Sequence, residues 1–337
     1  RGSRLAFLRK QLVPELGRQN TIDGAKNVWS IAASKNAEES SDIHDNFLFV
    51  YDGENTKAYS RPEGEDQGSE DDAVSSPYIE RTDAEFEQEG ETIDIGTLAH
   101  RTRIVQCRQN EIRTYDADLG LSQIIPMIDE ETEEELKIAH TSFCDPYLLV
   151  LRDDSSVQVL RVEKNGDIEP LEPDDATLTE SKWLGGCAYS GSLTRDQAVV
   201  FLLREDGSLH AFSLPELKPI FTAPNLSHLP PILYTENTQR RVGARETLTE
   251  IIVADIGPTD TSEPYLILRS AADSFTIYEP FHYPANNTFG SWHNSLRFRK
   301  VPTTHVPKFD ATDDGSVRTS PLRPIKIAGY NAVSVSG

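Results

Sequence analysis

Several carboxylates occur at polar turns in the middle of the chain. Glycosidases use a pair of carboxylates for hydrolysis, so these residues are the first candidates for a catalytic site. The residues concerned are Asp153, Asp154, Glu205, Asp206 and Asp273. Each also occupies a turn position, where an acidic side chain accepts hydrogen bonds from its own backbone. We therefore expect them to shape turns, and hydrolysis stays an alternative that requires them to converge on one channel.

Other reactive side chains show no spacing that would build a site. The eight histidines lack His-x-His and His-x-x-x-His spacing, and the sequence contains no phosphate-binding loop or nucleophile elbow. Cys107, Cys144 and Cys187 stand apart in apolar runs, so we expect buried, reduced thiols. The sequence predicts no enzyme, no metal, no cofactor and no small-molecule substrate. The histidines are His44, His100, His140, His210, His228, His282, His293 and His305.

Two basic clusters are the remaining candidates for binding. They consist of Arg240, Arg241 and Arg245, and of Arg297, Arg299 and Lys300. The chain carries 55 acidic and 33 basic residues, for a formal charge of −22, which repels a phosphate backbone. We expect the clusters to form local pairs or to contact a partner protein, and direct RNA binding stays an alternative.

These residues would be positioned by a hairpin that recurs along the chain. In residues 145–162 an apolar run, a polar turn and a second strand-like run follow one another, and residues 47–59, 102–115, 198–214 and 264–278 repeat this pattern. The equivalent points Asp52, Arg108, Arg152, Arg204 and Arg269 lie 56, 44, 52 and 65 residues apart. This spacing is typical of one four-stranded propeller blade. We predict an all-β, WD40-like β-propeller of about seven four-stranded blades.

The composition also suggests where the domain begins and is interrupted. We expect residues 1–27 to be a connecting segment and residues 28–337 to form the propeller. Acidic residues crowd 61–91, which predicts a long, mobile insertion, and 303–324 is a Pro/Thr-rich loop. Residues 129–135 form a second acidic run that predicts a surface turn. No apolar run approaches the ~18 residues of a membrane span, so no contact with a membrane is expected.

Four segments carry a family resemblance. They are Gly96 to Leu98 with Arg103 to Cys107 and Glu111 to Arg113, Cys144 to Val150, Leu296 to Pro302, and Gly329 to Val333. Together they resemble the large, multi-propeller subunit of the cleavage and polyadenylation specificity factor, a relative of the three-propeller proteins of damaged-DNA binding and of splicing. The similarity places the chain in the middle, second propeller of a fungal family member, and the ends of the chain indicate a piece of something longer.

The resemblance implies a non-catalytic scaffold in the nucleus. Its partners would be a WD-repeat subunit and a zinc-finger subunit that recognise the polyadenylation signal, together with the nuclease and polymerase modules. Pre-mRNA would be contacted only indirectly. Two alternatives remain open at this point: a related scaffold of the splicing factor 3b or cullin ligase type, and a propeller hydrolase.

Overall fold

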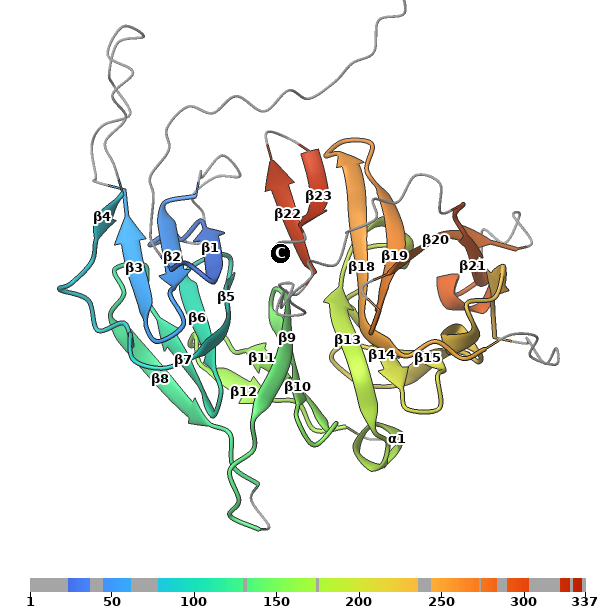
Figure 1. Ribbon diagram of the computed structural model, residues 1–337, viewed down its shortest axis with the longest axis horizontal. Coiled ribbons are helices and arrows are strands. Elements are labelled where there is room, and N and C mark those ends of the chain that lie inside the picture. The colour runs from blue at the N-terminus through green and yellow to red at the C-terminus, as the bar shows by residue number, and fades with distance from the viewer. Residues whose placement is uncertain are drawn as a thin grey trace, which may run out of the picture.

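The structure is a computed structural model of the chain that is built almost entirely from β-strands (Figure 1). It describes residues 24–36, 45–61, 78–129, 132–173, 176–235, 244–272, 274–283, 290–302, 322–327 and 330–334. One short α-helix, α1 (Ala176–Glu180), and three 3-10 turns accompany the strands in these ranges. None of the described helices has the length and apolar character needed to cross a membrane.

Four consecutive strands form each of the first four sheets, and every neighbouring pair within them is antiparallel. The first sheet holds β1 (Asn27–Ile31), β2 (Phe47–Tyr51), β3 (Thr56–Ser60) and β4 (Ile79–Glu80). The second holds β5 (Thr92–Leu98), β6 (Arg103–Arg108), β7 (Glu111–Tyr115) and β8 (Leu121–Pro126). The third holds β9 (Ile138–Cys144), β10 (Tyr147–Arg152), β11 (Val157–Val162) and β12 (Ile168–Pro170). The fourth holds β13 (Trp183–Tyr189), β14 (Val199–Arg204), β15 (Leu209–Ser213) and β16 (Pro219–Ala223).

The fifth sheet is larger, with the strand order β17-β21-β20-β19-β18-β23-β22. Its strands are β17 (Ile232–Leu233), β18 (Leu248–Pro258), β19 (Glu263–Ser270), β20 (Phe275–His282), β21 (Leu296–Lys300), β22 (Arg323–Ile327) and β23 (Tyr330–Ser334). Most of β18 pairs with β19, whereas its last two residues pair with β23. The hairpin β22–β23 therefore continues the sheet beyond its four central strands.

Side-chain hydrogen bonds join the first strand of each blade to the first strand of the next. Trp29 of β1 donates to Asp94 of β5 over 2.8 Å, and Thr141 of β9 donates to the same carboxylate over 3.1 Å. The Ala188 amide of β13 donates to Ser142 of β9 over 3.0 Å. The Val253 amide of β18 contacts the Cys187 sulfur of β13 at 3.1 Å. Blades joined in this way, in chain order, have the architecture of a β-propeller, which confirms the predicted class of fold.

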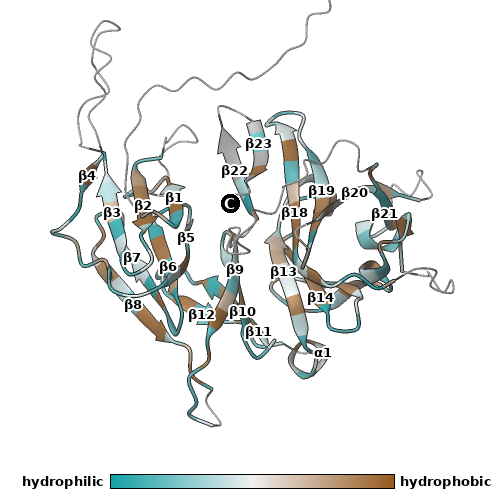
Figure 2. Ribbon diagram, viewed as in Figure 1, coloured by the Kyte–Doolittle hydropathy of each residue, from teal (hydrophilic) through white to brown (hydrophobic). Residues whose placement is uncertain are grey.

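The buried hairpins explain why the blades pack so closely. Alternate side chains of β10 point to opposite faces of its sheet. Leu149 and Leu151 enter the core shared with the fourth sheet, whereas Leu148 and Val150 enter a core shared with the second. All four are nearly inaccessible, as the continuous apolar run of this strand predicts. The apolar colouring of these inner strands is visible in Figure 2.

The predicted hairpins take equivalent places in the described sheets. Each of the five hairpins forms the second and third strands of one blade, and the described residues form five sheets where about seven four-stranded blades were expected.

The acidic insertion predicted over 61–91 is too long at its carboxyl end. Residues 62–77 lie outside the described part of the chain, but residues 78–91 are built into the first two blades. Ile79 begins β4, and Phe86 is buried with its ring 4.9 Å from that of Phe49 and 5.2 Å from that of Tyr115. Phe86 thus gives this acidic stretch a buried apolar side chain, which the overall composition of the stretch does not indicate.

The other predicted boundaries fall mostly on residues outside the described ranges. Residues 1–23 of the connecting segment and 303–321 of the Pro/Thr-rich loop lie outside the described ranges. Within the described ranges, β1 starts at Asn27, one residue before the expected start of the propeller. Leu322 is buried and β22 starts at Arg323, so the loop ends two residues before the predicted end at residue 324.

The three cysteines are unpaired thiols in the described residues. Cys107 and Cys187 are buried, and desolvation raises the pKa of Cys187 to about 12 and that of the partly buried Cys144 to about 11. A thiol reacts with alkylating agents as its thiolate, so burial with a raised pKa should protect all three. We expect iodoacetamide at pH 8 to label Cys107 and Cys187 at least a hundredfold more slowly in the native protein than in 6 M guanidinium chloride.

Peptide mass spectrometry after timed labelling measures this difference for each cysteine. The partly buried Cys144 serves as an internal comparison, and it should react faster than the other two in the native protein. Equal rates for Cys187 in the native and denatured protein would contradict its placement between β13 and β18.

Candidate protein interaction surface

The predicted basic residues of the fifth sheet lie on β21, which is next to the edge strand β17. In β21 the alternation of apolar and basic residues places Leu296 and Phe298 on the buried face, where the Phe298 ring is 6.1 Å from that of Phe221. Arg297 and Arg299 point to the opposite face because successive side chains of a strand alternate. The packing of Phe298 therefore fixes the direction in which both arginines project.

An arginine stacked between two tyrosines is the central feature of this face. The guanidinium carbon of Arg297 lies 4.7 Å from the ring centroid of Tyr234 and 4.6 Å from that of Tyr283. Tyr283 is 60% exposed, so the stack is open to solvent. Stacking on aromatic faces restricts the arginine rotamers and leaves the edge of the guanidinium free to donate hydrogen bonds.

Neighbouring residues extend the stack into a larger surface. Arg299 pairs with Glu279 of the adjacent strand through a 2.6 Å hydrogen bond from Nε, and its guanidinium carbon lies 5.6 Å from the centroid of Phe281. Ile232 of the edge strand β17 is opposite Arg299 and is 40% exposed. We call this set the stacked-arginine surface: Ile232, Tyr234, Glu279, Phe281, Tyr283, Arg297 and Arg299.

Lys300 and Arg245 do not belong to this surface. The Lys300 amide donates to the Pro231 carbonyl, which holds β17 against β21, and the residue follows Arg299, so its side chain starts on the other face. Arg245 instead contacts the Glu205 carbonyl in the turn between β14 and β15 of the fourth blade. Arg240 and Arg241 lie outside the described residues. The predicted clusters thus supply two residues of the stacked-arginine surface.

Sequence reasoning missed the aromatic part of this surface. Tyr234 comes from the connection after β17, and Tyr283 from the end of β20, so neither is near Arg297 in the sequence. Phe281 lies in β20 and Tyr283 directly follows the end of this strand, so their spacing of two residues is a signal that both face the same way. It could have been combined with the basic alternation of 296–300.

The turn carboxylates hold turns, as expected from the sequence. Asp154 Oδ1 accepts from the Ser156 amide and hydroxyl, and Asp206 Oδ1 accepts in the same way from Ser208. The two turns belong to different blades, β10–β11 and β14–β15. Asp273 lies outside the described ranges. Within the part of the chain that is described, no three His, Cys, Asp or Glu side chains gather in a way that could hold a metal ion.

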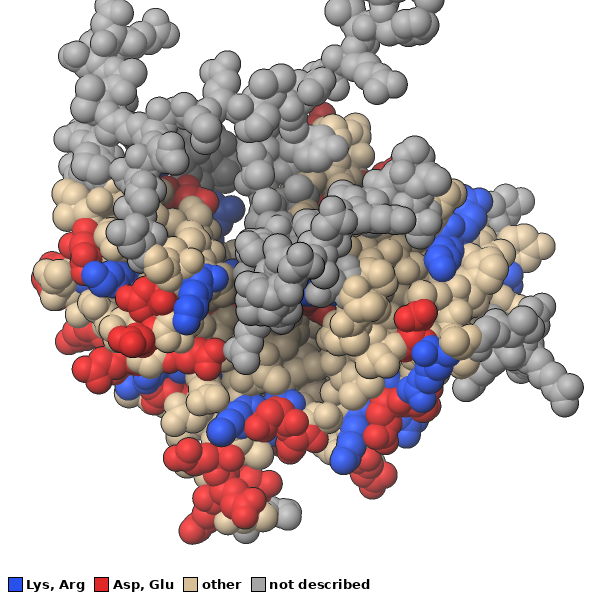
Figure 3. Space-filling view, viewed as in Figure 1, with Lys and Arg blue, Asp and Glu red and all other residues tan. Residues whose placement is uncertain are grey.

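Charge on the visible face of the molecule is predominantly acidic but mixed (Figure 3). In the second acidic run, between β8 and β9, residues 132–135 are exposed, and the Asp129 amide donates a 2.9 Å hydrogen bond to the Glu134 carbonyl. The prediction of a surface turn at this point is confirmed. Within the described residues, exposed aromatic and arginine side chains meet most closely in the stacked-arginine surface, a composition enriched in protein interfaces.

Comparison with known proteins identifies the family. The model of the RSE1/DDB1/CPSF1 second β-propeller matches residues 15–337 of the chain. The chain belongs to this family. The resemblance to the large subunit of the cleavage and polyadenylation specificity factor, and the placement in its second propeller, are confirmed.

Curated relatives of this family member are fungal proteins. Protein cft1 of Neurospora crassa is 40% identical over 279 residues, which cover 76% of this chain and 19% of that protein. Protein CFT1 of Coccidioides immitis is 35% identical over 353 residues, covering 99% of this chain and 25% of that protein. Protein cft1 of Schizosaccharomyces pombe is 21% identical over 88% of this chain. The chain spans about a fifth to a quarter of the length of these relatives.

Proposed function

We propose that this propeller is a non-catalytic scaffold domain of the nuclear machinery that cleaves and polyadenylates pre-mRNA. Membership of the second-propeller family and similarity to fungal cft1 proteins support this assignment. The observation that carries the scaffold role is the stacked-arginine surface, where Arg297 lies between two tyrosines. Such a surface supplies rigid aromatic area and oriented donors for binding a protein, and it contains no paired nucleophile and base.

The partners that we propose are the other subunits of the cleavage and polyadenylation factor. These are the WD-repeat and zinc-finger subunits that recognise the polyadenylation signal and the nuclease module that cuts the transcript. The propeller would contact pre-mRNA only through them, because the net charge of −22 opposes a phosphate backbone.

Co-purification of the tagged full-length protein from nuclear extract tests this assignment. We expect mass spectrometry to identify polyadenylation factors, whereas splicing factor 3b subunits or a cullin ligase would overturn it in favour of a related scaffold. A protein carrying Arg297→Ala and Tyr283→Ala should lose at least one of these subunits. The matched control Lys164→Ala changes an exposed residue of the third blade and should retain all of them.

The net negative charge of the chain also leads to a prediction about RNA. We expect the isolated chain to retain a 30-nucleotide uridine-rich RNA on a filter no better than background at 50 to 200 mM salt. The physical reason is repulsion, since the chain carries 22 more acidic than basic side chains. Tight retention that weakens steeply as salt rises would instead reveal phosphate contacts by a local basic patch.

A further inference from the structure

We infer that a pocket between the first two blades binds an acidic linear peptide that carries one apolar side chain. The pocket has a volume of about 570 Å³, within the range of sites that hold ligands in proteins. Its walls come from the β1–β2 connection, the end of β3, the strand β4, and the turn between β7 and β8. This inference concerns a surface on the first two blades and does not depend on the complex to which the protein belongs.

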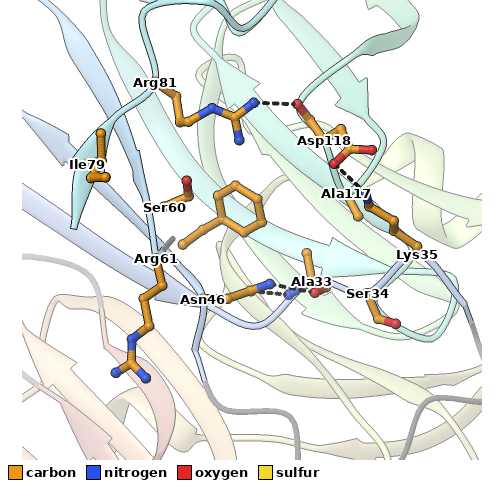
Figure 4. A pocket seen from close by; sticks show the side chains of 11 residues that line it. Ala33, Ser34, Lys35, Asn46, Ser60, Arg61, Ile79, Arg81, Ala117 and Asp118 are labelled. Carbon is orange, nitrogen blue, oxygen red and sulfur yellow. Dashed lines mark hydrogen bonds and ion pairs between the residues drawn. The ribbon is translucent and has the colours of Figure 1, made fainter. Parts of the chain in front are cut away.

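Two described residues of the pocket wall, Ala33 after β1 and Asn46 before β2, are joined by a pair of hydrogen bonds. The Asn46 side chain donates to the Ala33 carbonyl and accepts from the Ala33 amide, with both distances at 2.8 Å (Figure 4). Phe47 lines the same space and is 4% exposed, whereas Ile79 on β4 is 54% exposed. The pocket therefore offers an apolar side chain of a ligand the exposed surface of Ile79, with the Phe47 ring beneath it.

Cations outnumber acids around this apolar surface. Lys35, Arg61 and Arg81 line the pocket together with a single acidic residue, Asp118. The Lys35–Asp118 pair spans 2.9 Å, but both side chains are more than half exposed, and pairs of this kind contribute little in water. A carboxylate from a ligand can therefore compete for these cations at small cost.

Arg61 is the cation best suited to meet a ligand. Its guanidinium carbon lies 5.5 Å from the centroid of the Tyr78 ring, and it makes no ion pair with any residue that the structure describes. Figure 4 shows it reaching outward from the end of β3, at the rim of the pocket. Arg81 pairs with Asp83 at 3.0 Å, although that carboxylate is 74% exposed. Arg61 thus presents donors to an incoming carboxylate, whereas Arg81 also contacts the Asp118 carbonyl at 3.4 Å and would exchange the exposed Asp83 carboxylate for that of the ligand.

Two features favour a peptide over a nucleic acid or a small molecule. β4 is the edge strand of its sheet, so its outer backbone groups are open to an added strand. The net charge of −22 repels the extended phosphate backbone of a nucleic acid, whereas a short peptide confines its charge to the three cations. The geometry points to an extended segment that places an apolar side chain near Phe47 and carboxylates beside Arg61 and Arg81.

Fluorescence anisotropy with the complete 337-residue chain tests the inference. The probe is a fluorescein-labelled peptide of sequence Gly-Asp-Glu-Leu-Glu-Asp-Ser-Gly, compared with versions in which Leu is replaced by Ser or the acids by Lys. We expect saturable binding of the first peptide and at least a tenfold weaker affinity for each of the other two. The double substitution Arg61→Glu and Arg81→Glu should weaken binding at least tenfold, and the control Lys164→Glu less than twofold.

The chain's own residues 62–77 join Arg61 to Tyr78 and are acidic, so the titration is repeated with their Asp and Glu changed to Asn and Gln. Peptide binding that depends on Arg61 and Arg81 in either protein supports the inference. Binding in neither protein overturns it, as does binding that the double substitution leaves unchanged. Uridine-rich RNA that binds more tightly than the peptide and is lost in the same variant would overturn the choice of partner. Circular dichroism spectra that match the unsubstituted protein establish that each variant is folded.

Discussion

Replacing Trp183 with alanine should lower the free energy of unfolding by about 3–5 kcal/mol, the usual cost of removing a buried aromatic side chain. Trp183 is 1% exposed and lies edge-on to the rings of Phe212 and His210, at 5.7 and 5.3 Å between centroids. Its indole N–H donates to the Leu178 carbonyl of α1 over 2.8 Å. The substitution leaves a cavity between the third and fourth blades and an unpaired carbonyl, so both losses add.

Urea unfolding followed by circular dichroism measures this loss as a shift in the midpoint. The conservative variant Trp183→Phe retains a ring but loses the hydrogen bond, so it should fall between the two extremes. The matched control is Leu184→Ala, which changes the next residue of β13, whose side chain is 44% exposed. That control should change the free energy of unfolding by less than about 0.5 kcal/mol, as surface substitutions usually do. A similar loss in both variants would contradict the packing described for Trp183.

The hairpins could be predicted because they are local. In β10 and β11, the apolar run, the polar turn and the second run lie within 16 residues, and the register follows from the turn. The first strand of the fourth blade is less regular, because the register of β13 against β14 shifts between Trp183 and Gly185. The pattern of an apolar run, a polar turn and a second run was therefore sufficient to place the second and third strands of every described blade.

The sites depend on contacts that join distant segments, and these leave no periodic signal. The tyrosines beside Arg297 come from positions 234 and 283, and the pocket combines residues from 33 to 118. The basic alternation of 296–300 predicted which side chains point outward but not what they stack on. Likewise, the acidic composition of 78–91 did not indicate that Phe86 is buried, because its burial depends on contact with the ring of Tyr115 in the neighbouring blade.

The Asp94 side chain contacts strands that lie far from it in the sequence, and a pattern of local hairpins does not predict such contacts. Its side chain on β5 is 15% exposed and accepts hydrogen bonds from Trp29 of β1 and from Thr141 of β9. The Arg323 guanidinium of β22 lies 3.2 Å from Asp94 Oδ1 and 5.0 Å from the centroid of the Trp29 ring. One carboxylate thus connects the first three blades to the hairpin β22–β23.

Replacing Asp94 with alanine should therefore lower the free energy of unfolding by about 3 kcal/mol, near the lower end for breaking a buried ion pair. The substitution leaves the Arg323 charge, the Trp29 N–H and the Thr141 hydroxyl without this acceptor. Asp94→Asn keeps an acceptor for Trp29 but removes the charge, so it should cost about 1–2 kcal/mol. The exposed Lys57–Glu80 pair provides the control, and Lys57→Ala should cost less than about 0.5 kcal/mol.

A double-mutant cycle separates the ion pair from the hydrogen bonds. Arg323→Met removes the cation and leaves Asp94 with Trp29 and Thr141, so it should cost less than Asp94→Ala. If the two charges interact, the double variant should be more stable than the sum of the single losses by at least about 1 kcal/mol, since contacting residues are not additive. Hydrogen exchange provides a second measurement, because each single variant should speed exchange of the amides in β22 and β23 that pair the two strands, while amides of β14 keep their protection. Additive losses with unchanged exchange in the hairpin would mean that Asp94 stabilises its own blade alone, and that β22–β23 is held by its pairing with β18.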